Sequence, residues 1–546
     1  MTTTGTPPLS SAPTWLHCAR GADPASDPVG CRGRQVEPYG ACLAHLTNAD
    51  RTTYLSALAP GSDLDHRGTQ ISEGLLQQLL DALRDPATGR PCLGNVRFDG
   101  ATFSGEASFG GVTFSGHAEF REATFTGRVI FGGVTFGSDA WFGKTTFTDD
   151  AWFVRATFTG RAEFNGATFH CDGWFTNAAF ESTSEFGPLI CAGFVQLSGA
   201  VFGGPVTIAI AATTLGCRRT RWASTAALRL RYATVDLSDA VFEYPLSIIA
   251  RSAPFTDWSG GVFAEELLAG SDAGVRMVSL RGADAAHLVL QDVDLSTCLL
   301  SGTVHLDQLR LEGECPLESA PSGLRRRGLR VVRWTARRTL AEEQHWRAAQ
   351  GRSEWTAAPA GVEVVGPAQL APIYRQLRKS FEDSKNEPDA ADFYYGEMEM
   401  RRHDRQRPRA EHALLALYWA VSGYGLRASR ALAWLLGAMA ATVLVMMLWG
   451  LPADDPKSVT TGRLTGQDIS LTTDKPDPVN PTGSLSSRLS SERWENSVRI
   501  VVNSVVFRSS GEDLTTAGSY IEMASRLTEP VLLGLAVLAI RGRVKR

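Results

Sequence analysis

The chain has 546 residues and a formal net charge of −4. This length accommodates several domains of about 100–200 residues each. The nearly balanced charge gives no electrostatic basis for a nucleic-acid partner. The nine cysteines follow no regular framework, and an odd number without a signal peptide favours reduced thiols over a disulfide scaffold.

Residues 1–14 are rich in Thr, Pro and Ser. They have neither the basic start nor the apolar stretch of a signal peptide. We predict a disordered tail here and expect the domains that follow it to be cytoplasmic.

Residues 15–68 form an irregular segment that contains Cys and His but few apolar residues. Four residues could together bind one zinc ion: Cys18, Cys31, Cys42 and His45. A structural zinc ion would help to explain how so polar a segment folds. The alternative is that these are plain reduced cysteines, because a zinc ribbon normally has two close pairs and Cys18 and Cys31 lie far apart.

Residues 69–94 are predicted to form a helical cap for the repeat that follows. Ser72 is a suitable N-cap, the leucines between residues 75 and 83 share one helical face, and Asp85-Pro86 ends the helix. Such a helix can cover the unpaired strand edges at the end of a stacked β-structure.

Residues 95–315 contain the strongest pattern of the chain, a phenylalanine at every eleventh position. One series runs from Phe98 to Phe186, and a second series from Phe103 to Phe180 interleaves with it at spacings of five and six. On a helix these spacings would place Phe in two stripes about 140° apart, which excludes a single coiled-coil seam. A continuous strand is excluded as well, because a step of five reverses the face.

Short strands broken by turns remain, each with one inward Phe, and this arrangement is a β-helix. Two such repeat units make one coil, so that Phe98 and Phe120 occupy equivalent places in successive coils. The coils should stack about 4.8 Å apart. Phe then stacks on Phe, and a small residue two positions earlier fills the space between. We interpret three cysteines of this region as small packing residues: Cys171, Cys191 and Cys298.

A leucine version of the repeat runs from Val278 to Gly302 as VSLRG ADAAH LVLQD VDLST CLLSG. It resembles the pentapeptide-repeat family, whose pattern is A-(D/N)-L-x-x, and the Phe block resembles the Phe-rich variant of that family. The resemblance implies a right-handed quadrilateral β-helix, from which loops such as Ser252 to Gly274 bulge. Some members are DNA mimics that bind topoisomerases, but their acidic faces are denser than the one expected here.

Residues 316–368 are predicted to be a basic linker and residues 369–430 a helical connector. The arginines between Arg325 and Arg338 either belong to a solvated helix or contact anionic lipid headgroups. Apolar positions from Leu370 to Met398 predict an αα-hairpin for packing or oligomerisation.

Residues 431–546 are predicted to be a two-pass membrane segment. Ala431–Leu451 is a charge-free apolar run, and about 20 residues of this kind suffice to cross a bilayer. The second span begins near Ala517 and includes three ionisable residues on one helical face: Glu522, Arg526 and Glu529. These groups either pair near the interface or turn toward a pore or a partner helix. Positive charge before the first span and after the second predicts that both termini are cytoplasmic.

Trp494–Phe507 is a short amphipathic stretch between the two spans. The order of span, short helix, loop and span resembles the two-pass pore-loop ion channels and implies a re-entrant-like loop. Residues 508–513 depart from that family, because RSSGED stands where the T-V-G-Y-G filter would replace the hydration shell of potassium. The resemblance is therefore to a degenerate form, and potassium selectivity is not supported.

These parts together predict a membrane-anchored, non-enzymatic scaffold with the β-helix as a cytoplasmic surface for protein partners. No nucleophile elbow, P-loop, Rossmann fingerprint or metal-hydrolase motif is present in the sequence. The alternative is a channel-like protein with the β-helix as its regulatory domain. The expected partners are membrane lipids, an unidentified protein and further copies of the chain, with structural zinc as the one cofactor considered.

Overall fold

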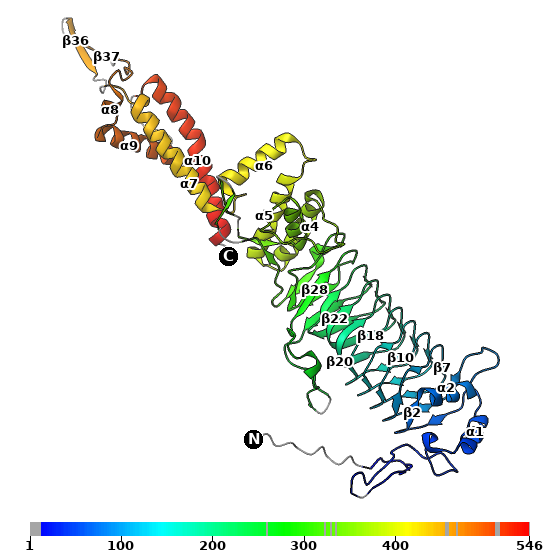
Figure 1. The fold of residues 1–546 in the computed structure, drawn as a ribbon. Helices are drawn as coiled ribbons and strands as arrows, with labels where there is room; N and C mark the ends of the chain where they lie inside the picture. The colour runs from blue at the N-terminus through cyan, green and yellow to red at the C-terminus, as the bar shows by residue number, and fades with distance from the viewer. Residues whose placement is uncertain are drawn as a thin grey trace. The chain divides into compact units, whose positions relative to one another are not determined.

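The computed structural model divides the chain into two compact units, Met1–Phe393 and Tyr394–Arg546 (Figure 1). The described residues are 12–23, 25–257, 260–321, 324–327, 330–333, 336–453, 458–465, 468–474, 476–507 and 514–544. Residues 1–11 of the predicted tail lie outside this described part, and so do all of residues 508–513, which stand at the position of the filter.

The first unit contains a parallel β-solenoid of about 10 coils (Figure 1). In its first part each strand pairs in parallel with the strand two Phe repeats further along the chain, as Val129 does with Ala151. The coil length predicted from the Phe spacing is thus confirmed.

Strands recur at four positions along each of these coils. The first position holds β4 (Val96–Arg97), β8 (Ala118–Glu119), β12 (Ala140–Trp141) and β16 (Ala162–Glu163). The second holds β5 (Thr102–Ser104), β9 (Thr124–Phe125), β13 (Thr146–Phe147) and β17 (Thr168–Phe169). The third holds β6 (Ala107–Ser108), β10 (Val129–Ile130), β14 (Ala151–Trp152) and β18 (Gly173–Trp174). The fourth holds β3 (Cys92–Leu93), β7 (Thr113–Phe114), β11 (Thr135–Phe136), β15 (Thr157–Phe158) and β19 (Ala179–Phe180).

Phenylalanine side chains fill the interior in four columns, and the two series between Phe98 and Phe186 are buried throughout. Along a column the rings stack almost parallel, with 5.1 Å between the centroids of Phe120 and Phe142 and 1° between their planes. Between columns they meet edge to face, as Phe142 and Phe153 do at 85°. Both geometries are favourable for aromatic rings. The stacking distance is close to the spacing of about 4.8 Å between hydrogen-bonded strands, so ring contacts and backbone hydrogen bonds form together.

The coil becomes shorter after β19. Two register shifts separate the pairing of β20 with β22 into three parts. Beyond these shifts, paired residues lie two positions closer in the sequence than they do in the Phe block. Val206 pairs with Ala226 here, whereas Val129 pairs with Ala151 in the Phe block. Cys191 is buried and takes the core position that Phe169 holds one coil earlier, as expected for a packing residue. The strands of this part are β20 (Glu185–Gln196), β21 (Val201–Phe202), β22 (Val206–Gly216), β23 (Arg221–Trp222), β24 (Ala226–Arg231), β25 (Thr234–Asp236), β26 (Val241–Phe242), β27 (Leu246–Ala250), β28 (Val275–Ser279), β29 (Leu288–Gln291), β30 (Val293–Asp294) and β31 (Arg310–Glu312).

An insertion follows β27, as predicted for Ser252 to Gly274. Before it, Thr214 of β22 pairs with Thr234 of β25. Thr234 then pairs with Arg276 of β28, which is more than twice as far away in the sequence. The insertion is fastened to the solenoid by a buried ion pair, in which Arg231 and Glu265 approach to 3.0 Å.

An N-terminal cap precedes the solenoid, and it consists of α1 (Asn48–Ser56), β1 (Leu64–Asp65), β2 (Gln70–Ser72) and α2 (Glu73–Ala82). The predicted helix is present, and the leucines of its apolar face are buried. Ser72 caps it by accepting a hydrogen bond from the backbone N–H of Leu75 at 3.4 Å. The start of the predicted helical cap is different in the structure. Residues of β2 form a strand there, which adds to the solenoid sheet by pairing with β5.

His66 ends one column of rings inside this cap. Its ring lies 6.2 Å from that of Phe98, and its Nε2 lies 3.2 Å from the hydroxyl of Tyr54. Burial lowers the pKa of His66 to about 4. The imidazole is therefore neutral at pH 7, and the protein would have to take a buried charge to protonate it.

Residues 316–368, expected to be a linker, contain regular structure. They include β32 (Glu318–Ser319), β33 (Leu324–Arg327), β34 (Arg330–Arg333), β35 (Arg338–Thr339) and α3 (Ala341–Ala349). Arg337 is buried and pairs with Glu343, so for this residue both a solvated helix and a lipid contact are wrong. The predicted αα-hairpin is confirmed as α4 (Pro367–Asp383) and α5 (Glu387–His403), where Phe381 stacks on Phe393.

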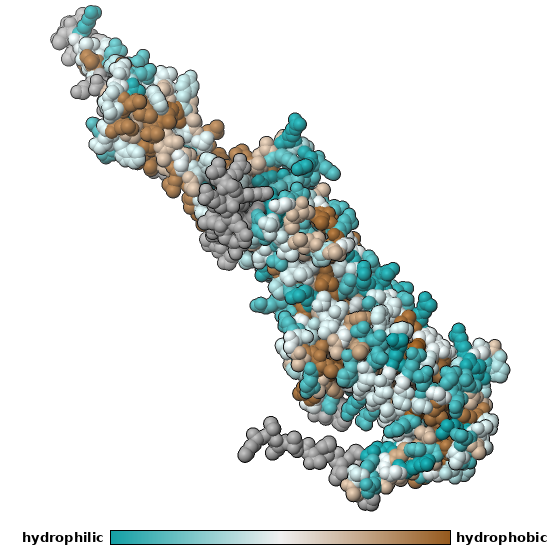
Figure 2. Space-filling view, in the orientation of Figure 1, coloured by the Kyte–Doolittle hydropathy of each residue, from teal (hydrophilic) through white to brown (hydrophobic). Residues whose placement is uncertain are grey.

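The second unit contains the two predicted spans. The stretches Ala428–Gly450 and Thr516–Arg541 form helices of 23 and 26 residues that are long and apolar enough to cross a bilayer. Hydrophobic residues gather on the surface of this unit (Figure 2). Its elements are α6 (Arg409–Ser422), α7 (Ala428–Val445), a π-helical turn (Met446–Gly450), β36 (Val459–Thr465), β37 (Asp468–Asp474), α8 (Leu485–Arg488), α9 (Ser491–Phe507) and α10 (Thr516–Val544).

The ionisable face of α10 contains one pair of charged residues and one carboxyl group that contacts another helix. Arg526 Nη2 lies 2.6 Å from Glu522 Oε1, so these two residues form a pair one turn apart. Glu529 is fully buried, and its Oε1 accepts a hydrogen bond from the Thr442 hydroxyl of α7 at 2.8 Å. Glu529 therefore faces the neighbouring helix.

Replacing one ring in a column should destabilise the solenoid. We expect Phe142→Ala to lower the free energy of unfolding by about 3–5 kcal/mol, because it removes two stacking contacts and leaves a cavity. Urea titration of the purified protein, with hydrogen exchange to localise the loss, measures this change. Val201→Ala, at a position 39% exposed on the outside of the same solenoid, should change the value by less than about 0.5 kcal/mol. Equal effects of the two substitutions would contradict the importance of the columns.

The N-terminal cap should loosen in mild acid. Below its usual pKa of 6.5, His66 binds a proton in the unfolded state that the folded state accepts only near pH 4. The stability that depends on neutral His66 is present above pH 6.5 and falls as the pH decreases, by about 2 kcal/mol between pH 7 and 5. Hydrogen exchange of residues 64–83, corrected for intrinsic rates, measures it. His66→Gln should remove this dependence, and a wild-type cap equally stable at both pH values would refute the assignment.

Candidate functional site: a Cys3His group and a cavity

The four predicted zinc ligands come together in the irregular N-terminal segment. Cys18 and Cys31 are brought close by a backbone hydrogen bond from the N–H of Ala19 to the carbonyl of Cys31, 2.9 Å long. Cys42 precedes a short 3-10 helix (Leu43–His45), which places His45 one turn after it. The fold thus brings Cys18 and Cys31 together, although they lie far apart in the sequence.

The donor atoms of the group lie within 4.8 Å of one another. The Sγ atoms of Cys31 and Cys42 are 3.7 Å apart, and His45 Nδ1 lies 3.5 Å from Cys18 Sγ and 3.4 Å from Cys42 Sγ. A tetrahedral zinc ion, with Zn–S near 2.3 Å and Zn–N near 2.0–2.1 Å, separates two sulfurs by about 3.8 Å and sulfur from nitrogen by about 3.6 Å. The group could therefore hold a tetrahedral metal ion.

The electrostatics of the group also fit a cation. Burial, with the neighbouring Cys31 and Cys18, raises the pKa of Cys42 to about 12, so a thiolate there needs a positive charge close by. Burial and then Arg20 lower the pKa of His45, which keeps the imidazole in the neutral form that binds metals. Gly33 packs directly against Cys42, and a side chain there would not fit, because a Cβ on Gly33 would lie 2.8 Å from the Cβ of Cys42.

The C-terminal end of the solenoid is covered by α3 and α4. Glu342 Oε1 accepts hydrogen bonds from the backbone N–H groups of Leu300 at 2.5 Å and Ser301 at 2.9 Å. The Ser380 hydroxyl donates to the Leu309 carbonyl at 2.6 Å. These side chains replace the next coil as partners for the strand edge.

A buried charge network holds α3 in place. Glu343 is fully buried and accepts from Arg337 Nη2 at 2.5 Å, from Arg347 Nε at 2.6 Å and from the Tyr374 hydroxyl. Burial acts to raise the pKa of Glu343, but the charges of Arg337 and Arg347 outweigh it and hold the pKa at about 2. The carboxylate is thus ionised at neutral pH.

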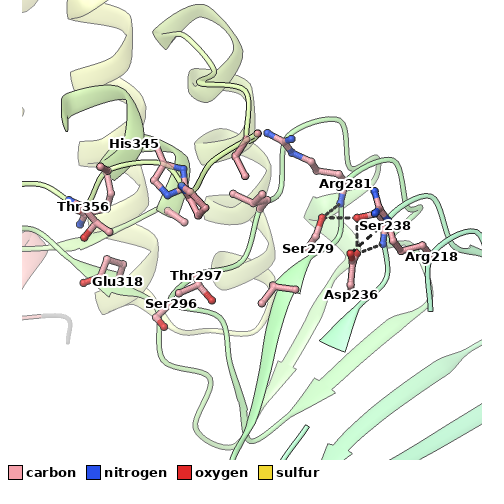
Figure 3. A pocket seen from close by; sticks show the side chains of 18 residues that line it. Arg218, Asp236, Ser238, Ser279, Arg281, Ser296, Thr297, Glu318, His345 and Thr356 are labelled. Carbon is pink, nitrogen blue, oxygen red and sulfur yellow. Dashed lines mark hydrogen bonds and ion pairs between the residues drawn. The ribbon is translucent and has the colours of Figure 1, made fainter. Parts of the chain in front are cut away.

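A cavity of about 440 Å³ lies between the last coils and α3. Figure 3 shows Arg281, Ser279 and Ser238 on the solenoid side, with His345 and Thr356 on the side of α3 and the chain after it. The rest of the lining is mixed. Its apolar side chains are Val278, Leu299, Ala341, Ala357, Pro359 and Val362, and its polar ones are Arg218, Asp236, Ser296, Thr297, Glu318 and Gln344. It has the size and the mixture of surfaces that are typical of small-molecule sites.

No pattern in the sequence indicates this cavity. Arg281 stands at an outward repeat position, and His345 lies in a short helix much later in the chain, so no spacing connects them. The sequence of the charged stretch Glu342–Arg347 likewise does not indicate that its charges are buried. Buried charges of this kind are indistinguishable in sequence from those of a solvated helix.

The fold and its repeat define a β-solenoid repeat protein. The family model described as pentapeptide repeats (9 copies) matches residues 98–146. Residues 98–146, which belong to the Phe block, therefore carry pentapeptide repeats, as the Phe pattern predicted. No curated protein and no solved structure matches it.

Proposed function

We propose that this protein is a non-enzymatic scaffold, anchored in a membrane, whose solenoid presents a rigid surface to a protein partner. The observation that supports the proposal best is a stripe of large side chains on the outside of the third strand position. Ile130, Trp152 and Trp174 follow one another in successive coils. All three are partly exposed, although outward positions of a solvated sheet are usually polar.

The chemistry of this stripe is that of a protein contact. The guanidinium of Arg128 lies 4.9 Å from the centre of the Trp152 ring. Among the described residues, the indole N–H groups of Trp152 and Trp174 are buried without a hydrogen-bond partner, so these side chains offer a partner their apolar ring surface. Trp and Arg are enriched among residues that dominate binding energy at interfaces. A solenoid held by coil-to-coil hydrogen bonds loses little freedom on binding, which favours affinity.

Membrane anchoring is proposed from α7 and α10. Large apolar side chains stand out from both helices, such as Leu436 at 65% and Leu527 at 74% exposure. Lipid would remove this surface from water at a gain of about 25 cal/mol per Å². The arginines flanking the spans favour cytoplasmic termini and a cytoplasmic solenoid, which we propose to be the right-handed quadrilateral form.

We also propose that the Cys3His group binds structural zinc. All four positions are filled by protein donors, which is typical of a structural site and leaves none for a reacting water. The metal would tie the irregular segment 15–68 together, where few apolar side chains are available to do so.

The zinc proposal predicts that metal content depends on two of the cysteines. The purified chain should contain about one zinc ion, and Cys18→Ser with Cys42→Ser should abolish it, because two tetrahedral ligands are lost. Elemental analysis measures the content, and a chelator should lower the unfolding midpoint of the wild type. Cys92→Ser, a half-exposed cysteine outside the group, is the control. Unchanged zinc in the double variant would exclude the site.

The scaffold proposal predicts that a partner protein contacts the outside of the third strand position. A photo-crosslinking amino acid at Trp152 should give adducts with a membrane or cytoplasmic protein in native membranes, because the stripe lies in the contact. The same probe at Thr157, on the outside of the next strand position of the chain, should give few. Ile130→Ala combined with Trp174→Ala should reduce the adducts severalfold.

Three results would contradict this function. Equal adducts from residues 152 and 157 would show that the stripe is not the contact surface. Release of the chain from membranes by alkaline carbonate would refute anchoring. Ion conductance of the purified protein in planar bilayers would favour the channel-like alternative.

A further inference from the structure

The cavity beside α3 contains a cationic group that the fold leaves incompletely paired. Arg281 Nε is buried and makes no hydrogen bond, and its Nη2 donates to the Glu363 carbonyl at 3.3 Å. Among the described residues, no carboxylate forms an ion pair with Arg281. A buried guanidinium nitrogen without a partner is unfavourable, so a bound group that accepts from it would be stabilised.

A second unpaired group faces the same cavity from the opposite wall. His345 is 7% exposed, and its Nδ1 has no hydrogen-bond partner. Burial and then the charge of Arg281 lower the pKa of His345. The imidazole is neutral at pH 7, and a neutral imidazole can donate one hydrogen bond from a ring nitrogen.

The carboxylates near the cavity are engaged elsewhere. Asp236 accepts from both the backbone and the hydroxyl of the serine two positions later, at 2.9 and 2.6 Å, and lies 3.5 Å from Arg218. Glu318 accepts from the backbone N–H of the residue that follows it, at 3.1 Å. Glu342 accepts from the strand edge of the last coil. Arg281 therefore forms no direct ion pair among the described residues, although its charge partly offsets the effect of burial, which raises the pKa of Glu342. The three acids nearby would repel a highly charged anion.

We propose that this cavity binds a small organic monoanion, a carboxylate with an apolar body. One guanidinium balances one negative charge, and the planar carboxylate matches the fork of its N–H groups. His345 would donate to a carboxylate oxygen from the other wall. The body would lie against Val278, Leu299 and Val362, which line the same space. The neighbouring acids disfavour a phosphate monoester, which carries more negative charge.

The bound molecule would also connect two parts of the first unit. Arg281 follows β28 of the solenoid, whereas His345 belongs to α3, which covers its end. An anion held by both would fasten the C-terminal cap to the last coils. The proposal stands independently of the scaffold function, because it rests on a different surface.

Calorimetric titration of the full-length protein with benzoate and hexanoate tests the proposal. Either carboxylate should bind, whereas benzamide, which has the same body without the charge, should bind about tenfold or more weakly. Phenyl phosphate should bind more weakly than benzoate. Arg281→Gln should weaken benzoate binding by about ten- to a hundredfold, and His345→Gln should weaken it less. Arg229→Gln, an exposed arginine of β24 outside the cavity, should leave it unchanged.

The ligand comparison needs no substitution, so it decides the proposal even where a variant folds poorly. Equal binding of benzoate and benzamide would overturn the role of the charge. Absence of binding by both carboxylates at millimolar concentration would overturn the site itself. Tighter binding of phenyl phosphate would overturn the class of ligand, and unchanged affinity in folded Arg281→Gln would overturn its assignment to Arg281.

Discussion

Contact between equivalent side chains in successive coils is the interaction on which the solenoid depends. A phenylalanine stacks on the phenylalanine one coil later at 4.9 Å, as Phe142 does on Phe164, while the strands that carry them exchange backbone hydrogen bonds. Each coil therefore gains its stability from its two neighbours, and no coil is complete alone. The first and the last coil each have a neighbour on one side only, so other interactions must stabilise the two ends of the stack.

The two ends are closed in opposite ways. At the N-terminal end, α2 lays leucines over the first coils, and neutral His66 continues the ring column. At the C-terminal end, Glu342 bonds to the strand edge and Glu343 is fixed between two arginines. An apolar cap tolerates changes of side-chain packing, whereas a buried ionic network requires one geometry, because a displaced charge is left without a partner. The cavity with Arg281 and His345 lies beside this more demanding end.

The sequence predicts the periodic parts of this fold well, because spacing alone reports which side chains share an environment. Phe98 and Phe120 lie one coil apart in the sequence and stack in the structure. The leucine face of α2 and the αα-hairpin follow from helical periodicity for the same reason. The shortening of the coil after β19 was not predicted, because Cys191 and its neighbours replace Phe and remove the marker. Arg337 was misinterpreted, since a charge buried by a partner distant in space looks in sequence like a charge exposed to solvent.

For a related reason, the Cys3His group can be predicted from the sequence, whereas the cavity cannot. Cys18, Cys31, Cys42 and His45 belong to residue types that suggest metal binding wherever they occur together, and one short segment contains all four. Arg281 and His345 are ordinary residues whose significance arises from a cavity formed by two elements far apart in the chain. Composition can indicate the first kind of site, whereas the second depends on tertiary structure.

The insertion after β27 shows how this architecture can acquire new parts. Thr234 and Arg276 pair although the whole insertion lies between them in the sequence, and the pairing shifts by one residue where Asp236 meets Ser279. The stack therefore closes above the insertion with a local irregularity. The added chain is held to the outer wall by the ion pair of Arg231 and Glu265 and by an apolar cluster. In this cluster Phe255 and Leu268 of the insertion are buried together with Ile190, Ala209 and Ala211 of the solenoid. Turns between coils can therefore lengthen while the coils continue to stack, and a binding segment or a whole domain could be accommodated there.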